Sequence, residues 1–343
     1  MDFRPSPAQQ LLVSTAREFL RKRGDETPSW RAIAELGWPG LLIPPELGGS
    51  GGALLDVVLL IEEMARAATP GPFVPSAVVA TSLLLGAGTL DQQKRFLPAM
   101  AAGERIVGVG VLEDGALTLD ARGRLSGRKL FVEAADADAL ILAARRGRDV
   151  VLCLVPSDRA GVVRTPLDTI GVEPVFAITL DGVAVGAEDV LAGAGDALTA
   201  ALAAGALART AEMVGAAQRV LELAVEHAKT RVQGGRPIGG YQAIQHACAD
   251  LVRDVDASRG LLHSAAWKLD AGEAAAADVA MAKAYAGEAC LGVARRGHQI
   301  FGAIGYCDEH ALHRLHKRIL AASLDCGDAA LHLETVARAI GLA

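Results

Sequence analysis

Proline is almost absent from the C-terminal part of the chain, and this feature constrains the fold more than any other. Residues 194–343 contain a single proline, Pro237, while their apolar residues recur at helical spacing. Proline removes a backbone donor and kinks a helix interior, so long stretches without it favour unbroken helices. The sequence therefore predicts a bundle of long helices over residues 194–343.

Two other patterns precede this bundle. Residues 1–104 carry the helical period, and Ser6, Pro7 and Gln9 have the types and spacing of a capped first turn. Residues 105–193 contain short runs rich in Val, Ile and Leu, separated by Gly, Asp and Pro, which is typical of strands. The order predicts an α+β multidomain protein with an N-terminal α-helical domain, a middle β domain and a C-terminal helical bundle.

Composition excludes several classes of protein. The chain has 343 residues and a net charge of −6, and no Lys/Arg run is long enough to follow a nucleic-acid backbone. Neither a signal peptide nor an uninterrupted apolar stretch of roughly 18 residues is present, so a reducing cytoplasm is the expected compartment. Zinc sites and disulfide frameworks are not expected, because no CxxC pair occurs. The cysteines are Cys153, Cys248, Cys290, Cys307 and Cys326.

Four segments of the chain resemble the acyl-CoA dehydrogenase family of flavoproteins, in the family's order. The clearest similarity lies in RVQGGRPIGGYQ, residues 231–242. The segments are residues 36–52 with Glu62 downstream, 89–104, 211–251 and 299–318. The resemblance covers nearly the whole chain. It implies an all-α N-terminal domain, a middle β-barrel or sandwich domain and a C-terminal four-helix bundle.

The resemblance also implies a chemistry. FAD sits between the middle and C-terminal domains of the family, close to a neighbouring subunit. The family reaction is α,β-dehydrogenation of an acyl-CoA thioester, in which a carboxylate removes the α-proton and the β-hydrogen leaves as hydride to the flavin. Electron-transfer flavoprotein or a similar protein is the implied electron acceptor.

The resemblance assigns cofactor contacts to two parts of the chain. The family's match to Arg231 reaches the FAD of the adjacent subunit, and a guanidinium can pair bidentately with a pyrophosphate; capping of the helix C-terminus is the alternative. Gln299, Gly302 and Gly305 match the adenine-side contact, where glycine lets the backbone approach a dinucleotide. A tight helix–helix corner is the alternative for either glycine. Phe131 stands in place of the Trp of the family's Trp-Ile-Thr flavin contact.

The chain departs from the family at the catalytic base. The family places a Glu either shortly after the C-terminal flavin-contacting stretch or on the first bundle helix, and these positions hold Cys326 and Gly205. Asp325, one residue away, would point about 100° around a helix from that position, and Glu212 lies roughly two turns from Gly205. Asp328 is a third nearby acid. The resemblance therefore implies a missing base, with Asp325 or Glu212 as substitutes and Cys326 as a small packed residue.

The middle domain departs as well. The family's Thr-Glu-Pro…Gly-Ser-Asp loop is reduced to LEDG, residues 112–115, and Gly234 replaces the Phe of the family's RxxFG. Glu133 replaces the Thr of the Trp-Ile-Thr contact, which puts a carboxylate near the flavin's electron-rich pyrimidine edge and predicts an unfavourable charge. The half-site for the chain's own flavin is therefore eroded, whereas Arg231 and residues 299–302, which serve a neighbour, are kept.

These departures lead to one principal hypothesis and several alternatives. The chain resembles the base-less subunit of heteromeric α2β2 acyl-CoA dehydrogenases, such as those acting on steroid side chains, with a homologous partner supplying the base. One alternative is a self-sufficient homo-oligomeric enzyme that uses Asp325 or Glu212 as an unusual base. Another is a flavin-free acyl-CoA-binding or scaffold homologue. A fourth is a relative that oxidises nitroalkanes or hydroxylates with flavin, because fold alone does not choose a chemistry.

Three histidines recur at every third residue and could suggest a metal site. They are His310, His313 and His316. The matching stretch of the family is also charged and His-bearing without being a metal site, so we expect no metal here.

Overall fold

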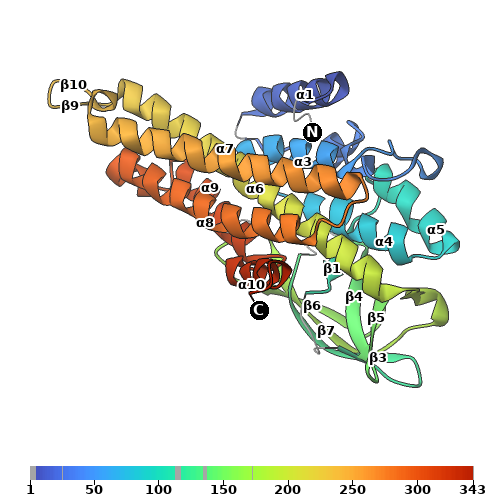
Figure 1. Ribbon diagram of the computed structural model, residues 1–343. Helices are drawn as coiled ribbons and strands as arrows, with labels where there is room; N and C mark the ends of the chain where they lie inside the picture. The colour runs from blue at the N-terminus through green and yellow to red at the C-terminus, as the bar shows by residue number, and fades with distance from the viewer. Residues whose placement is uncertain (1–4, 25, 113–116, 134–136, 172, 343) are drawn as a thin grey trace.

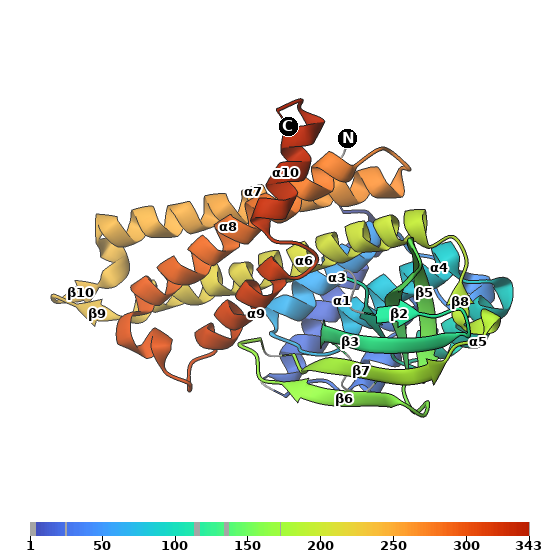
Figure 2. The same ribbon diagram turned by 90° about the horizontal axis from the view of Figure 1, so that it is seen from below.

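The computed structural model describes residues 5–24, 26–112, 117–133, 137–171 and 173–342. Helices come first, a mixed β-sheet follows, and long helices complete the chain (Figure 1). The sheet lies at one end of the helical body, and α10 (Ala329–Ala339) projects from the side of the molecule in the rotated view (Figure 2). This arrangement confirms the predicted fold class.

The first helix begins where the sequence predicts it. The Ser6 hydroxyl accepts a hydrogen bond from the backbone N–H of Gln9 at 3.2 Å, and the Gln9 side chain accepts one from the Ser6 N–H at 2.8 Å. Thr89 and Gln92 form the same capping box on α5. The elements of this part are α1 (Pro7–Arg23), α2 (Trp30–Ala34), η1 (Trp38–Gly40), η2 (Pro45–Leu47), α3 (Leu54–Arg66), the π-helical η3 (Phe73–Ala80), α4 (Thr81–Ala87) and α5 (Leu90–Ala101).

The strands form one mixed sheet in the described part of the middle segment. Its order is β6-β7-β3-β2-β4-β5-β8, and β1 pairs with β4. Alternate residues of β4 face opposite sides, so Ile141 joins the core shared with the helices, whereas Leu140 and Leu142 join a second core on the other face. The strands are β1 (Val107–Gly110), β2 (Leu117–Leu119), β3 (Arg124–Val132), β4 (Ala139–Arg146), β5 (Asp149–Pro156), β6 (Val162–Leu167), β7 (Val175–Ala184) and β8 (Val190–Leu191), with η4 (Ala187–Asp189) before β8.

Long helices fill the rest of the chain, as the scarcity of proline predicts. Helix α6 (Ala194–Thr230) runs through the middle of the molecule and packs on α3, α7, α8 and α9. Gly215 permits close contact with α3, since a β-carbon there would collide with the carbonyl group of Glu62. The other elements are β9 (Val232–Gln233), β10 (Arg236–Pro237), η5 (Ile238–Gly240), α7 (Gln242–Asp270), α8 (Ala276–Phe301), η6 (Gly302–Tyr306) and α9 (Leu312–Leu324), which precedes α10.

Within the described ranges, α6 is the helix that is long and apolar enough to cross a membrane, with a mean hydropathy of 1.2 over its apolar window. However, 72% of that window is buried inside the protein. The apolar side chains of α6 therefore pack against neighbouring elements, as in the core helix of a bundle.

Candidate active site

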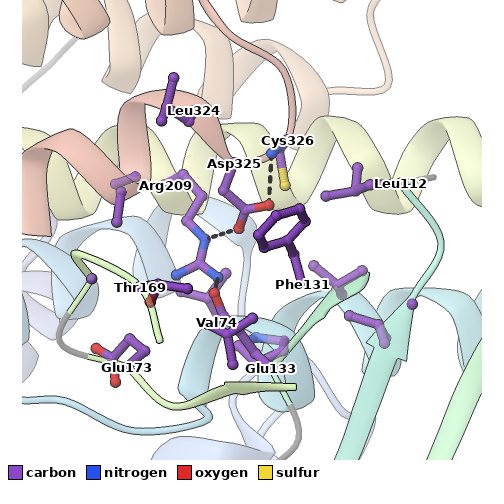
Figure 3. Close-up of a pocket in the computed structure, with 18 of the residues that line it drawn as sticks. Val74, Leu112, Phe131, Glu133, Thr169, Glu173, Arg209, Leu324, Asp325 and Cys326 are labelled. Atoms are coloured by element: carbon purple, nitrogen blue, oxygen red, sulfur yellow. Dashed lines mark hydrogen bonds and ion pairs between the residues drawn. The ribbon is translucent and has the colours of Figure 1, made fainter. Parts of the chain in front are cut away.

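A cavity of about 620 Å³ lies between the sheet and the C-terminal helices (Figure 3). Its walls come from η3, β1, β3, residues 168–175, α6 and α9. Most of its lining is apolar, and a few charged groups share one region. A cavity of this size and character is the usual form of a small-molecule site.

Arg209 is the central charged group of the cavity. It lies in α6, is 5% exposed, and donates to three carboxylates: Nε to Asp325 at 2.6 Å, Nη1 to Glu212 at 2.7 Å and Nη2 to Glu133 at 2.6 Å. Figure 3 shows the guanidinium between Asp325 and Glu133. Because Glu133 follows β3 and Asp325 follows α9, one buried cation joins the sheet to the bundle.

Arg318 in α9 extends this arrangement. Its Nη2 donates to Glu212 Oε1 at 2.7 Å and lies 3.3 Å from Glu173 Oε1, while Nη1 donates to the carbonyl oxygen of Thr69 at 2.7 Å. Each oxygen of Glu212 therefore accepts from a different arginine. We call the whole group the arginine network: Arg209, Arg318, Glu133, Glu173, Glu212 and Asp325.

Burial and the two arginines shift the acidities of these carboxyl groups in opposite directions. Burial favours a higher pKa for Glu212, but Arg209 and Arg318 outweigh it and lower the pKa to about 2. Burial, with help from the charges of Asp325 and Glu212, raises the pKa of Glu133 to about 7 against the effect of Arg209. Glu212 is thus a poor proton acceptor at neutral pH, whereas Glu133 exchanges a proton in that range.

The two positions expected to match the family's base lie side by side, and Cys326 lines the cavity. A β-carbon built on Gly205 would lie 3.1 Å from Sγ of Cys326. Burial raises the pKa of the Cys326 thiol far above its usual range, so the thiol stays protonated. Neither position provides a proton acceptor at neutral pH.

The helical direction expected for Asp325 is wrong. Helix α9 ends at Leu324, so Asp325 and Cys326 lie in the loop before α10, and Cys326 has a positive φ of 55°. Asp325 Oδ2 accepts from Arg209, and its Oδ1 accepts from the Cys326 N–H at 2.9 Å. Asp328 caps α10 by accepting a hydrogen bond from the N–H of Leu331 at 2.9 Å. Both aspartates therefore have structural contacts.

The departures in the middle segment gather at the same cavity. Glu133, where the sequence predicts an unfavourable charge beside the flavin, pairs with Arg209, although its pKa is still raised. Phe131 lines the cavity with a positive φ of 54° and a side chain that is 66% exposed. Leu112 also lines it, while residues 113–115 of the reduced loop lie outside the described residues.

A buried lysine holds the loop that carries Cys326. The Nζ of Lys283 in α8 donates to the carbonyl oxygens of Ser323 at 2.9 Å and Gly327 at 2.7 Å. Burial lowers the pKa of Lys283 to about 8. Since these carbonyls flank Asp325 and Cys326, Lys283 acts as a positioning residue for this part of the cavity wall.

The residues matched to a neighbour's cofactor lie elsewhere. The β9–β10 turn after Arg231 is at the end of the bundle far from the sheet (Figure 1). The His227 ring, in the last turn of α6, stacks on Phe301 at the end of α8 with 4.4 Å between centroids. Arg231 and Gln299 are exposed, and Gly302 has a φ of 66° with nothing within 4 Å of its β-carbon position. The ends of α6 and α8, which these three residues adjoin, therefore meet at the end of the bundle away from the sheet.

Gly305 differs from Gly302. It is buried, and a β-carbon there would lie 3.0 Å from Cβ of Phe301 and 3.2 Å from Cδ2 of Leu312. The absence of a side chain at Gly305 thus serves packing, which is the helix-corner alternative.

The histidines of this region pack with neighbouring groups. Nδ1 of His316 lies 3.1 Å from Nε2 of His298, the His310 ring lies 4.4 Å from that of Phe301, and His313 Nε2 lies 3.1 Å from the Asp308 carbonyl oxygen. In the part of the chain that the structure describes, no group of three His, Cys, Asp or Glu residues could hold a metal ion.

Sequence reasoning missed the two arginines that organise the cavity. Arg209 and Glu212 interrupt the apolar stretch 201–217 of α6, and this was an available signal, because buried charges are rare unless paired. Arg318 offered no such signal, since it lies in a segment rich in charged residues. Its partners, Glu173 and Glu212, are distant in sequence and meet it only in the folded chain.

A sheet set between two helical regions, with a ligand cavity against the second, defines a protein of the acyl-CoA dehydrogenase class. The chain belongs to the acyl-CoA dehydrogenase family. The family model for the acyl-CoA dehydrogenase N-terminal domain matches residues 6–104, and that for the C-terminal domain matches residues 192–341. The chain's relatives include acyl-CoA dehydrogenases and reductases, which are oxidoreductases acting on CH–CH donors.

Individual relatives span most of the chain. It is 33% identical over 299 residues to acyl-CoA dehydrogenase IpdE2 of Mycobacterium tuberculosis, covering 86% of this chain and 81% of that protein. It is 30% identical over 315 residues to 3-(aryl)acrylate reductase of Clostridium sporogenes, covering 84% and 83%. A structure of the ChsE4-ChsE5 complex from Mycobacterium tuberculosis matches with a TM-score of 0.92 and 28% identity, covering 100% of both chains.

Proposed function

We propose that this chain is the subunit without a catalytic base in a heteromeric, FAD-linked acyl-CoA dehydrogenase. The proposed enzyme introduces an α,β double bond into an acyl-CoA thioester. The observation that carries the proposal is that Gly205 lies beside Cys326, which lines the cavity, and that neither residue is a carboxylate.

Asp325 and Glu212 do not replace the missing base. Asp325 accepts from Arg209 and from the Cys326 N–H, and Glu212 accepts from Arg209 and Arg318. Removal of an α-proton needs a carboxylate that is free to approach the substrate and has a suitable pKa. This engagement of both acids favours the heteromer over a self-sufficient enzyme that uses Asp325 or Glu212.

FAD is the cofactor of the proposed enzyme, and the far end of the bundle fits a dinucleotide. The exposed guanidinium of Arg231 makes no hydrogen bond or ion pair with a described residue, and Gln299 and Gly302 are exposed near the end of α8. These residues would hold the pyrophosphate and adenine side of the partner's FAD. When bound, FAD accepts the hydride of the substrate. FAD fits less well in the chain's own cavity, where Glu133 stands in place of the family's Thr.

Exposed apolar side chains support an association with another chain. On and just after α10, Leu331, Leu333, Ile340 and Leu342 are 55–78% exposed, and this helix projects from the body (Figure 2). Apolar side chains exposed together on one projecting helix are typical of an interaction surface. We propose a homologous subunit in an α2β2 assembly as the partner, electron-transfer flavoprotein or a similar protein as the acceptor, and the cytoplasm as the location.

Purification of the tagged chain from its native cells tests the proposal. The expected product is a yellow complex of two homologous chains with one FAD per pair, which dehydrogenates acyl-CoA only when both chains are present. Full flavin content and full activity of the chain alone would reject the proposal. A complex that stays colourless would instead favour the flavin-free scaffold.

A further inference from the structure

The cavity has features of a ligand site beyond the missing base. Large apolar side chains line it and remain more than half exposed, namely Leu112, Phe131, Ile170 and Leu324. Backbone strain also gathers there, since Phe131 and Cys326 are two of the three described non-glycine residues with positive φ. Exposed apolar walls and strained residues are both typical of binding sites.

Glu133 and Glu173 each have a carboxyl oxygen that accepts no hydrogen bond from a described residue, but Glu173 Oε1 is buried and lies 3.3 Å from Arg318 Nη2. The two oxygens of Glu212 accept from Arg209 and Arg318, and those of Asp325 accept from Arg209 and the Cys326 N–H. Glu133 Oε1 accepts from Arg209, while Oε2 has no hydrogen bond to a described residue. The Glu133 side chain lines the cavity and is 21% exposed. A polar atom at a largely apolar wall needs a partner, from solvent or from a ligand.

The ion pairs of the network favour an uncharged ligand group. Arg209 and Arg318 already pair with Glu133, Glu173, Glu212 and Asp325. An anionic ligand group would therefore find no unpaired arginine in the network, and burying a charge without a partner is costly.

The protonation of Glu133 indicates which uncharged group of the ligand it binds. A hydroxyl group can donate to the ionised carboxylate and accept from the protonated carboxylic acid. A ketone can only accept and an amide N–H can only donate, so each suits one protonation state. A carboxyl group that exchanges its proton near neutral pH is therefore best matched by a hydroxyl group.

We propose that the cavity binds an apolar, uncharged ligand through a hydroxyl group that hydrogen-bonds to Oε2 of Glu133. The identification of this ligand as the acyl part of a hydroxylated acyl-CoA thioester rests on the proposed function. The hydroxyl preference itself rests on the cavity wall and on the oxygens of Glu133, Glu212 and Asp325.

Three probes with one skeleton test the preference. Binding of 2-naphthol, naphthalene and 2-naphthoate to the full chain is measured at pH 7 by isothermal titration calorimetry. We expect 2-naphthol to bind at least about tenfold more tightly than either of the others, as a hydrogen bond to a charged group allows. Equal affinities for 2-naphthol and naphthalene, or tighter binding of 2-naphthoate, would overturn the proposal.

Substitutions of Glu133 test whether this residue causes the preference for a hydroxyl group. Glu133→Leu is expected to weaken 2-naphthol binding about tenfold while changing naphthalene binding less than about twofold. Glu133→Gln should retain part of the preference, because the amide both donates and accepts. Glu334→Gln, on exposed α10, is the matched control and should behave as wild type. An undiminished preference in Glu133→Leu would contradict the assignment.

The test of the hydroxyl preference and the test of the proposed function can fail independently of each other. If Glu133→Leu does not fold, as judged by its melting curve, the wild-type affinity ratio and the Glu133→Gln variant still decide the question. Full activity of the chain alone would reject the subunit proposal and leave the hydroxyl preference intact. Loss of the preference would leave the subunit proposal intact.

Discussion

The thiol sulfur of Cys326 lies 3.1 Å from the point where a β-carbon of Gly205 would stand. One residue belongs to the first helix of the bundle and the other to the loop before the last helix, yet the two lie side by side, and Cys326 lines the cavity. The same β-carbon would also lie 3.0 Å from Cγ2 of Val79, so a larger side chain at Gly205 would be crowded. Position 326 is therefore the better place to restore a base.

A base introduced at position 326 is expected to create dehydrogenase activity. We expect the variant Cys326→Glu with Glu133→Thr, loaded with FAD, to dehydrogenate a saturated acyl-CoA about 100-fold faster than the unmodified chain, since a positioned general base contributes about 10²–10⁴-fold. The measurement is anaerobic bleaching of the flavin absorbance by the acyl-CoA.

The matched control carries Cys326→Gln with Glu133→Thr. It has a side chain of the same size without a proton-accepting carboxylate, so it should stay at the background rate. Equal rates for the Glu and Gln variants would show that the absent carboxylate does not limit this chain.

Removal of Arg209 is expected to destabilise the fold strongly. Arg209→Met leaves the carboxylates of Glu133, Glu212 and Asp325 without their shared cation, and breaking a buried ion pair costs about 3–5 kcal/mol. Urea unfolding should show the loss. Arg219→Met is the control. The Arg219 side chain is 44% exposed, so loss of its ion pair with Glu222 should change the free energy of unfolding by less than about 1 kcal/mol. If both substitutions lowered the free energy of unfolding by a similar amount, the arginine network would not stabilise the fold as proposed.

Glu133 should give stability a characteristic dependence on pH. Its pKa rises from 4.5 to about 7 on folding, so in this interval the folded protein retains a proton that the unfolded chain has released. The free energy of unfolding is therefore expected to fall as pH rises from 4.5 to 7. Glu133→Gln keeps a partner for Arg209 and cannot titrate, so its urea midpoint should vary less across this range. Identical pH profiles for Glu133→Gln and wild type would refute the shifted pKa.

Arg231 is expected to matter for the flavin of the partner subunit. In the co-purified complex, Arg231→Ala should weaken FAD binding about 10- to 100-fold, the range for a charge-assisted hydrogen bond to a phosphate, without lowering the melting temperature of the isolated chain. Arg236→Ala lies in the same turn, where the guanidinium stacks over Tyr241 at 4.0 Å, and serves as control. The flavin content of each complex, from its absorbance spectrum, is the measurement. Equal flavin loss in both variants would point to the turn as a whole rather than to Arg231.

The order of structural elements could be predicted because it depends on local patterns. Capping residues such as Ser6 and Gln9, the scarcity of proline after residue 193 and the β-rich runs of the middle segment each act over a few residues. The family resemblance added the positions of the missing base, Cys326 and Gly205. Each of these features is present in the linear sequence before any long-range contact forms.

The character of the cavity was decided by the tertiary structure. Arg209 meets Glu133 and Asp325 only because α6 passes between the sheet and the loop after α9, and Arg318 reaches Glu212 only through helix packing. Burial at these contacts then separates the pKa of Glu212, at about 2, from that of Glu133, at about 7. Solvation and charge proximity depend on distances in space, so sequence spacing alone placed Asp325 on a helix and could not show that Arg209 pairs with Glu133.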